Sequence, residues 1–212
     1  MGVQVRNPDR INIFIDGSYR FSLTVPQVVD LNLKVGQELD ENTLKELEVE
    51  STYGKLYQRA LEYCLVRPRS QRELGDYLYK KTISRPVKNR TSGQVSMREG
   101  VSRSVADRVA SDLKDKDYVN DRSFAEYWVR NRSLRKGASS RKLRSELLGK
   151  GVSQAVIEEV MSESDRNDDE EIIKMIEKKR SRYSDDTKLM QYLARQGFSY
   201  DDIKSALDRE GS

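Results

Sequence analysis

The stretch ELLGKGVSQAVIEEVM, residues 146–161, places a glycine, Gly151, between two segments whose apolar residues have helical spacing. Nearly the same phrase returns as YLARQGFSYDDIKSAL, residues 192–207. A shift of 46 residues aligns the two copies and pairs Leu143 with Leu189, Leu147 with Leu193, Gly151 with Gly197, Val152 with Phe198, Ser153 with Ser199 and Ile157 with Ile203. The sequence therefore repeats one local structure, which is a helix, a short turn and a second helix.

A third copy of the turn lies earlier in the chain. A shift of 51 residues aligns Gly100-Val101-Ser102 with Gly151-Val152-Ser153. In each copy the glycine tolerates the left-handed conformation that ends a helix, the apolar residue packs into the core, and the serine caps the next helix. We therefore expect three turns of the same kind.

The first copy carries an insertion. Leu74 and Leu78 align with Leu143 and Leu147 at a shift of 69 residues, which exceeds the shift of the turn by 18 residues. The extra residues are Thr82 to Glu99, a polar and basic segment that is broken by proline and glycine. We predict a mobile loop at this position.

A further segment with helical spacing precedes each helix pair, at residues 53–66, 120–134 and 169–181. Repeats of this length usually stack into elongated, curved arrays that bind partners along an extended face. We therefore predict a mainly α-helical protein of tandem three-helix repeats in an elongated curved array, with its function on a surface.

The N-terminal residues follow a different pattern. In INIFIDGSYRFSL, residues 11–23, apolar positions alternate on both sides of Asp16-Gly17, a dipeptide that favours a tight hairpin. Residues 26–33 and 41–48 have short helical patterns. We predict a small α+β module with a β-hairpin at residues 1–52, repeat 1 at 53–118 with the insertion at 82–99, repeat 2 at 119–166 and repeat 3 at 167–212.

The composition excludes several classes of protein. Of the 212 residues, 36% are hydrophobic and 35% are charged, which favours thin cores and a large surface. The chain has no histidine and one cysteine, Cys64, so neither a Cys/His zinc site nor an internal disulfide is expected. No stretch is apolar enough for a membrane span, and the start, MGVQVRNPDRINIF, lacks a secretory pattern. We expect a reduced, soluble, intracellular protein with no metal and no cofactor.

Charge is divided unevenly along the chain. The net charge is −4 over residues 1–52, +13 over 53–150 and −5 over 151–212, and +4 in total. A basic middle between acidic ends indicates an anionic partner for the middle, either nucleic acid or an acidic protein groove.

Two groups of basic residues are the candidate binding sites. The first group falls within 21 residues and is opposed only by Glu146, whereas an ordinary solvated helix face mixes both signs. A solvated face without a ligand is the open alternative. The first group comprises Arg130, Arg132, Arg135, Lys136, Arg141, Lys142, Arg144 and Lys150, and the second, less well defined, comprises Arg67, Arg69, Lys80, Lys81, Arg85, Lys88 and Arg90.

Other conspicuous residues have structural explanations. One helix face carries a row of apolar and aromatic side chains, which is more typical of a core than of base stacking; these are Phe124, Tyr127, Trp128 and Leu134. Asn120 and Asp121 have positions typical of helix caps.

The acidic run at residues 168–171 lies at an expected helix start, where carboxylates favour the helix dipole, and this explanation is preferred to metal binding. The glycines lack the Lys-Ser/Thr of a phosphate-binding loop, and no nucleophile has a histidine base. We therefore expect no catalytic activity.

The stretch DYVNDRSFAEYWVRNRSLRKGASSRKLRSELLGKGV, residues 117–152, resembles the signature of the RecX family of regulatory proteins. In that family a Tyr-Leu-Asn-Asp-like turn precedes Phe-Ala, a basic helix, a glycine, Arg-x-Leu and Glu-Leu-x-x-Lys-Gly. Here the last elements are Gly137, Arg141-Lys142-Leu143 and residues 146–151. The resemblance extends to the opening hairpin, to RPRSQRELGDYL and to the third repeat, so it covers nearly the whole chain.

The resemblance implies a small protein without catalytic activity that binds the RecA recombinase filament on DNA. Family members typically lie along the filament groove and inhibit strand exchange, ATP hydrolysis and the coprotease function. The chain departs from the family pattern at Thr82, where glycine is common, and in the long insertion that begins there.

On this resemblance we expect a cytoplasmic, nucleoid-associated monomer that binds the RecA filament and, through its basic middle repeats, DNA. Two alternatives are open. Helix, short turn and helix is also the arrangement of helix-turn-helix readers, so the chain is alternatively a stand-alone DNA-binding protein. The third reading is a general protein scaffold.

Overall fold

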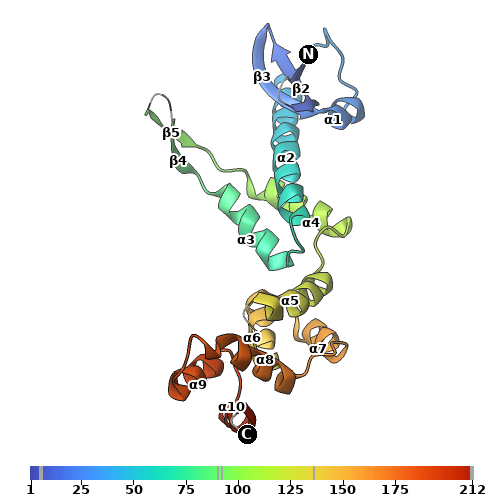
Figure 1. The fold of residues 1–212 in the computed structure, drawn as a ribbon. Coiled ribbons are helices and arrows are strands. Elements are labelled where there is room, and N and C mark those ends of the chain that lie inside the picture. Colours follow the sequence, from blue (N-terminus) through green and yellow to red (C-terminus); the bar gives the residue numbers. More distant parts are fainter. Residues whose placement is uncertain (5–6, 90, 92, 136, 211–212) are drawn as a thin grey trace. The chain divides into compact units, whose positions relative to one another are not determined.

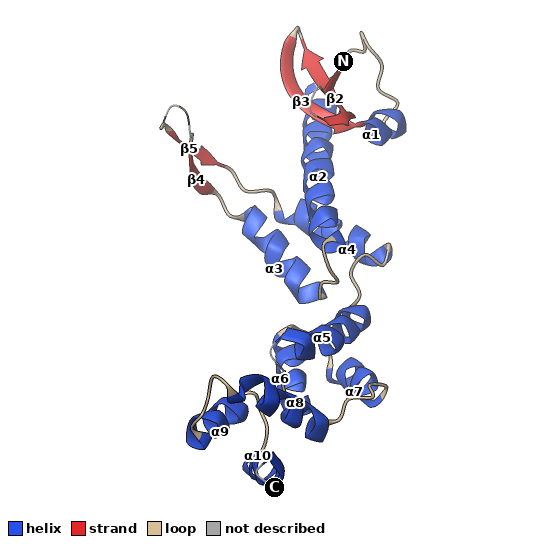
Figure 2. Ribbon diagram, viewed as in Figure 1, coloured by secondary structure: helices blue, strands red, loops and turns tan. Residues whose placement is uncertain are grey.

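The computed structural model describes residues 1–4, 7–89, 91, 93–135 and 137–210, and this part forms ten helices and five strands (Figure 1). The side chains of residues 133–135 are outside the part that the structure describes. Helices dominate and the strands are confined to two small sheets (Figure 2), so the predicted mainly α-helical class is confirmed. The chain divides into an N-terminal unit, Met1–Arg67 with Leu74–Tyr118, and a C-terminal unit, Pro68–Glu73 with Val119–Ser212.

The N-terminal unit begins with an antiparallel sheet in the order β1-β2-β3, formed by Gly2–Gln4, Asn7–Ile15 and Ser18–Thr24. Strands β2 and β3 form the predicted hairpin, and Asp16 and Gly17 between them have φ of 49° and 78°. Positive φ at both central residues is the geometry of the tight turns that favour such dipeptides. One face of the sheet buries its apolar side chains against the helices that follow.

Helix α1 (Val25–Asp30) starts at a capping box, and α2 runs without interruption through Glu41–Leu65. The two helical segments expected on either side of residue 52 are therefore one helix, and the expected domain boundary falls inside it. Gly54 lies within this helix and does not end it. A glycine is needed there because Gln27 packs closely against it, and a Cβ would lie 2.6 Å from Gln27 Oε1.

Helix α3 (Gln71–Thr82) is followed by the insertion, which is a β-hairpin and not the predicted loop (Figure 1). Strand β4 (Arg85–Lys88) pairs antiparallel with β5 (Val95–Arg98), and every residue of both strands is exposed. Pro86 is compatible with this pairing because each strand of a two-stranded ribbon has one free edge. Gly93, with φ of 70°, lies between the strands, where positive φ is compatible with a turn.

The turn after the hairpin differs from the prediction at Gly100. This glycine does not have positive φ and ends no helix, because the hairpin precedes it. It is required by a close approach instead, since a Cβ at Gly100 would lie 1.9 Å from the carbonyl oxygen of Thr82. The serine of the phrase has its expected role, because Ser102 caps α4 (Arg103–Asp115).

The C-terminal unit contains two three-helix repeats, and each has its own buried core. Repeat 2 consists of α5 (Asp121–Arg135), α6 (Ser140–Gly149) and α7 (Gln154–Ser162), and repeat 3 of α8 (Asp168–Arg180), α9 (Asp186–Arg195) and α10 (Tyr200–Glu210).

Both predicted turns of the C-terminal unit are confirmed. Gly151 and Gly197 have φ of 83° and 94°, and the apolar residue after each glycine is buried. Ser153 and Ser199 accept hydrogen bonds from backbone N–H groups in the first turns of α7 and α10. The Gly-apolar-Ser phrase in the sequence therefore marks the turn between the last two helices of repeats 2 and 3.

The aromatic residues of α5 belong mainly to the core of repeat 2. Phe124 is fully buried, and Trp128 packs partly buried against the same cluster. The side chain of Leu134 lies outside the described residues. The core explanation is thus confirmed for Phe124 and Trp128.

Asn120 and Asp121 have the expected capping roles, at two different helices. Asn120 Oδ1 accepts from the N–H of Arg122 at 2.9 Å at the start of α5. Asp121 Oδ1 accepts from the N–H of Gln71 at 2.8 Å, so it caps α3.

The acidic residues 168–171 occupy the first turn of α8, behind the N-cap Asn167, as expected. Among the described residues no group of three or more acidic or cysteine side chains is arranged to hold a metal ion. Within the same residues, no helix combines the length and apolar character that crossing a membrane requires.

One polar junction occurs twice inside the C-terminal unit. Ser70, just before α3, donates its hydroxyl to the carbonyl of Lys150 at 2.8 Å. Ser139, just before α6, donates its N–H to the carbonyl of Gln196 at 2.9 Å. Ser70 aligns with Ser139, and Lys150 with Gln196, so the start of one repeat's second helix contacts the turn of the next repeat in both cases.

The turn glycines are part of this junction. A Cβ at Gly151 would lie 2.7 Å from the Cβ of Arg72, and one at Gly197 would lie 2.8 Å from the Cβ of Lys142. Both glycines therefore have two reasons to be glycine, which are their positive φ and the close approach of the preceding repeat.

Candidate partner-binding surface

The basic residues of α5 and α6 were predicted to form a binding surface, but Arg132 is held inside repeat 2. Its Nε and one terminal nitrogen each donate to Glu146 at 2.9 Å, and Trp128 Nε1 donates to the same carboxylate at 3.0 Å. Both charged side chains are mostly buried, at 17% and 19% exposure. This network joins α5 to α6.

The electrostatics of Glu146 agree with this structural role. Burial opposes ionisation of its carboxyl group, but the hydrogen bonds from Arg132 and Trp128 and the charges of Arg132 and Lys142 outweigh burial and hold the pKa of Glu146 below its usual value. Glu146 is therefore an ionised acceptor at neutral pH, and Arg132 is its partner.

Lys150 is also engaged within the C-terminal unit. Its ammonium lies 2.9 Å from Glu73 Oε1 and 5.4 Å from the centre of the Trp128 ring. Arg69 approaches the same carboxylate at 4.0 Å, and its side chain is 13% exposed. These contacts fix the start of α3 against repeat 2, so Lys150 and Arg69 have structural partners.

Arg144 on α6 lies 3.0 Å from Glu158 on α7, and both side chains are substantially exposed. Such surface pairs contribute little to stability, but the positive charge of Arg144 is balanced by the carboxylate beside it. The sequence count, in which only Glu146 opposed the basic group, did not include partners supplied by the neighbouring helices.

Two cations of α6 retain exposed charge. Arg141 is exposed and forms no ion pair with the residues that the structure describes, and Lys142 is half-buried. Arg130 on α5 is exposed and lines a surface hollow. The side chain of Arg135 and the whole of Lys136 lie outside the described residues.

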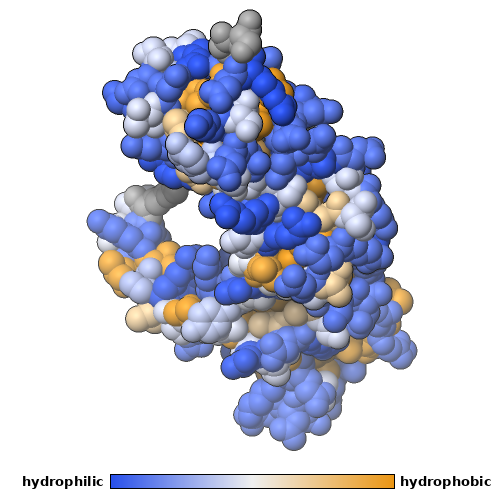
Figure 3. Space-filling model, turned by 90° about the horizontal axis from the view of Figure 1, so that it is seen from below, coloured by the Kyte–Doolittle hydropathy of each residue, from blue (hydrophilic) through white to orange (hydrophobic). Residues whose placement is uncertain are grey.

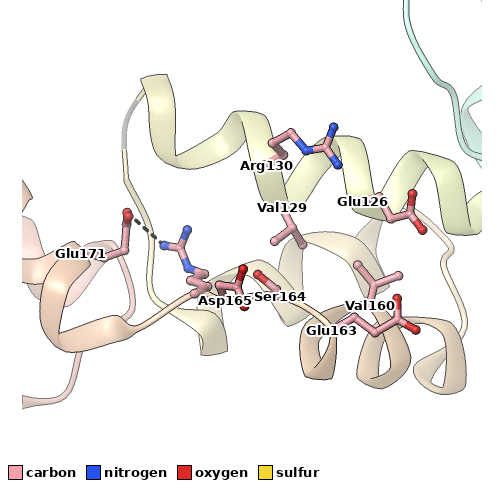
Figure 4. A pocket seen from close by; sticks show the side chains of 9 residues that line it. Glu126, Val129, Arg130, Val160, Glu163, Ser164, Asp165 and Glu171 are labelled. Carbon is pink, nitrogen blue, oxygen red and sulfur yellow. Dashed lines mark hydrogen bonds and ion pairs between the residues drawn. The ribbon is translucent and has the colours of Figure 1, made fainter.

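The hollow beside Arg130 has a volume of about 420 Å³, and four of the nine residues that line it carry carboxylates (Figure 4). Three of these acids have partners: Arg122 contacts both Glu126 and Glu163, and Arg166 contacts Glu171 at 3.4 Å. In Figure 4, Val129 and Val160 lie on facing helices at its base. The hollow therefore lies between two groups of ion pairs, one that joins α5 to α7 through Arg122 and one that joins Arg166 to the start of α8.

The second basic group is divided between the two units. Lys80 and Lys81 lie at the end of α3 in the N-terminal unit, and the ammonium of Lys81 lies 4.6 Å from the centre of the Tyr77 ring. Burial, followed by the nearby charges of Arg59, Arg85 and Arg98, lowers the pKa of Lys81. Arg67 follows α2 and is half-buried.

Sequence reasoning missed three basic residues that lie beside this group, Lys55, Arg59 and Arg98. Lys55 and Arg59 of α2 line the same pocket as Lys80 and Lys81, although they lie more than twenty residues earlier in the chain. Only the packing of α2 against the neighbouring helices could reveal them. The face of the molecule in Figure 3 is mostly hydrophilic, with apolar residues in separate groups.

Comparison with known proteins adds an independent observation. Three family models match the chain: the regulatory protein RecX N-terminal domain over residues 1–40, the second three-helix domain of RecX over 120–161 and the third over 167–207. Proteins named regulatory protein RecX from Bacillus subtilis strain 168 and Bacillus pumilus strain SAFR-032 are 32% and 31% identical over 99% and 98% of this chain and 75% and 74% of their own.

Solved structures share the fold. A crystal structure of a regulatory protein RecX superposes with a TM-score of 0.69 at 20% identity, covering 98% of this chain and 96% of its own. RecX from Lactobacillus salivarius superposes with a TM-score of 0.52 at 24% identity, covering 74% of this chain and 95% of its own. With the relatives that are more than 30% identical over nearly its whole length, these matches show that the chain belongs to the RecX family of regulatory proteins.

Proposed function

We propose that the protein is a non-enzymatic regulator that binds the RecA recombinase filament on DNA and lowers its ATPase, strand-exchange and coprotease activities. The observation that carries this proposal is membership of the RecX family, whose relatives are named regulatory proteins. On this proposal it acts as a monomer in the cytoplasm, associated with the nucleoid.

The mechanism is differential binding. A protein that prefers one conformation of the filament shifts the filament toward it and changes ATP turnover without chemistry of its own. The cations that suit this contact are those that form no ion pair among the described residues. In repeat 2 these include Arg141 and Lys142, whereas Arg132, Arg144 and Lys150 have carboxylate partners within the chain.

The charge of the helices that follow the glycine turns disfavours the rival function, a stand-alone DNA-binding protein of the helix-turn-helix type. In such readers the second helix of the motif enters the major groove. Here that helix is α7 or α10, and each carries exposed carboxylates: Glu158 and Glu159 on α7, and Asp201 and Asp202 on α10. These acids would be repelled by DNA phosphates.

The test is the DNA-stimulated ATPase of RecA on single-stranded DNA, with and without the protein. We expect the wild type to lower the rate and the double variant Arg141→Glu/Lys142→Glu to lose the effect. Arg144 is left unchanged because a glutamate there would face Glu158 and disturb the fold.

The matched control is Lys178→Glu/Lys188→Glu, which makes the same charge change on exposed lysines of repeat 3. Equal loss in both variants would indicate a non-specific charge effect. If the wild type leaves the ATPase rate unchanged but binds naked DNA in a sequence-dependent way, the helix-turn-helix reading replaces the proposal.

A further inference from the structure

The N-terminal unit contains a pocket of about 340 Å³ that is surrounded by cations. Residues from α2, from the end of α3 and from the base of the β4–β5 hairpin line it. Its only carboxylate is Glu99, and its basic residues are Lys55, Arg59, Lys80, Lys81, Arg85 and Arg98.

The positive charge of this pocket is not matched within the protein. Among the residues that the structure describes, none of these six cations forms an ion pair with a carboxylate, whereas in repeat 2 Arg132, Arg144 and Lys150 all do. Burial, then the charges of Arg10 and Arg59, lowers the pKa of Lys55. The like charges therefore repel one another, and an anion bound in the pocket would lower this electrostatic repulsion.

The hairpin adds to the repulsion. Arg85 and Arg98 are direct partners in the register of β4 and β5, and like charges directly opposite each other destabilise an antiparallel pair. The strands have no buried side chain to compensate, and an isolated two-stranded hairpin is marginal in water. A bound anion that contacts both guanidinium groups would convert this repulsion into a link between the strands.

A buried guanidinium adds to the positive potential beside the pocket. Arg10 of β2 is 4% exposed, and its Nε donates to the hydroxyl of Ser22 at 3.1 Å. One of its terminal nitrogens has no hydrogen-bond partner among the described residues. After burial, its charge is the next cause that lowers the pKa of Lys55, so Arg10 adds to the positive potential at this lining residue.

We propose that this pocket binds the phosphate groups of a nucleic-acid strand. Arginine forks match the geometry of phosphate oxygens, and three of the six cations are arginines. The lining contains no aromatic side chain on which a base could stack, so the contact is made to the backbone and does not depend on base sequence.

The choice of a nucleic-acid strand rests on the proposed function, because the RecA filament contains one. The test therefore uses DNA without the recombinase, so that its failure is distinct from a failure to alter the RecA ATPase. A fluorescently labelled oligothymidylate is titrated with the full chain and its anisotropy is measured at several salt concentrations.

Two double variants probe the pocket from different elements. Arg85→Gln/Arg98→Gln changes the hairpin. Lys55→Gln/Arg59→Gln changes two exposed residues of α2, so a loss of affinity in this variant does not come from unfolding of the hairpin. We expect each to lower the affinity at least tenfold at low salt. The slope of log affinity against log salt should become shallower by about 0.7 for each phosphate that the variant no longer neutralises.

The control is Lys34→Gln/Lys114→Gln, which removes two exposed charges of the same unit away from the pocket and should bind like the wild type. Equal weakening by this control would overturn the proposal, as would wild-type binding by either pocket variant. So would an absence of binding to the oligothymidylate at low salt.

Two competitors distinguish other anions. Polyglutamate that displaces the oligonucleotide at equal charge concentration would reassign the pocket to an acidic protein segment. Inorganic pyrophosphate that binds more tightly than the oligonucleotide would reassign it to a small phosphate ligand. Weak competition by both is the result that supports a strand.

Discussion

Replacing Gly151 by alanine is a direct test of how the repeats are built. The structure predicts two costs. A non-glycine residue at φ of 83° is strained by about 1–2 kcal/mol. The new Cβ would also lie 2.7 Å from the Cβ of Arg72, and such overpacking typically costs about 1–3 kcal/mol. Together they predict that the free energy of unfolding of repeat 2 falls by about 2–5 kcal/mol.

Gly149, two residues earlier, provides a control of opposite sign. It lies in the last turn of α6, has ordinary helical φ, and a Cβ there would meet no atom within 4 Å. Gly149→Ala should therefore stabilise repeat 2 by about 0.5–1 kcal/mol, because alanine is the better helix former.

Urea unfolding monitored by the fluorescence of Trp128 measures both variants. The chain has a single tryptophan, and it lies in the core of the repeat that contains both glycines. A third variant, Gly151→Asn, should recover about 1 kcal/mol of the loss, since asparagine tolerates positive φ better than alanine. The reasoning is refuted if Gly151→Ala is as stable as the wild type, or if the two alanine variants change stability in the same direction.

Three further predictions follow from the site geometry. Glu146→Gln should lower the free energy of unfolding of repeat 2 by about 1–3 kcal/mol at neutral pH, because it removes charged hydrogen bonds to Arg132. Since the pKa of Glu146 is depressed in the folded state, its contribution is present at neutral pH and lost as the pH falls through that pKa, so the wild type and the variant should converge in acid. Because the pKa of Lys55 is lowered, its amine should react faster than that of Lys34 with an acylating reagent at mildly alkaline pH. Oligothymidylate should protect Lys55 from this reaction. Mass spectrometry of the modified peptides measures the reactivity and the protection. Replacing residues 84–98 by a short Gly-Ser linker should leave the helical circular dichroism intact, since every residue of β4 and β5 is exposed. The same replacement should weaken binding to oligothymidylate. Loss of helical signal would show that the hairpin is structural.

Local patterns in the sequence were sufficient for the turns of repeats 2 and 3. The glycine, the apolar residue and the serine each act on their own neighbours, so Gly151 and Gly197 were predicted correctly. The prediction failed at Gly100 because the inserted segment changes what precedes it, and proline and glycine in that segment were taken as breakers rather than as parts of a hairpin. No local pattern explains Gly54 in α2, because the close neighbour of this glycine is Gln27, a residue distant in the chain.

The candidate site was less accessible to sequence reasoning because charge pairing is a tertiary property. The carboxylates that face Arg144 and Lys150 lie 14 and 77 residues away in the chain. Counting charges in a window could not include them. The same limit hid the pocket of the N-terminal unit, where Lys55 and Arg59 come from a helix that the charge count treated as separate from Lys80 and Arg85.

The junction between repeats has a direction, because the second helix of one repeat always contacts the turn of the next. Each junction joins a serine before a second helix to the carbonyl before the turn glycine of the following repeat. In repeat 3 the position of that serine is occupied by Asp185, which is exposed and caps its own helix α9.

At the other end of the series, the glycine turn of repeat 1 is already covered, because the carbonyl of Thr82 occupies the space beside Gly100. The space beside the turn glycine of repeat 1 is thus filled by the carbonyl of Thr82, whereas the space beside Gly151 and Gly197 is filled by the preceding repeat. Among the described residues, repeat 2 is therefore the repeat that takes part in both junctions, through the carbonyl of Lys150 on one side and the N–H of Ser139 on the other.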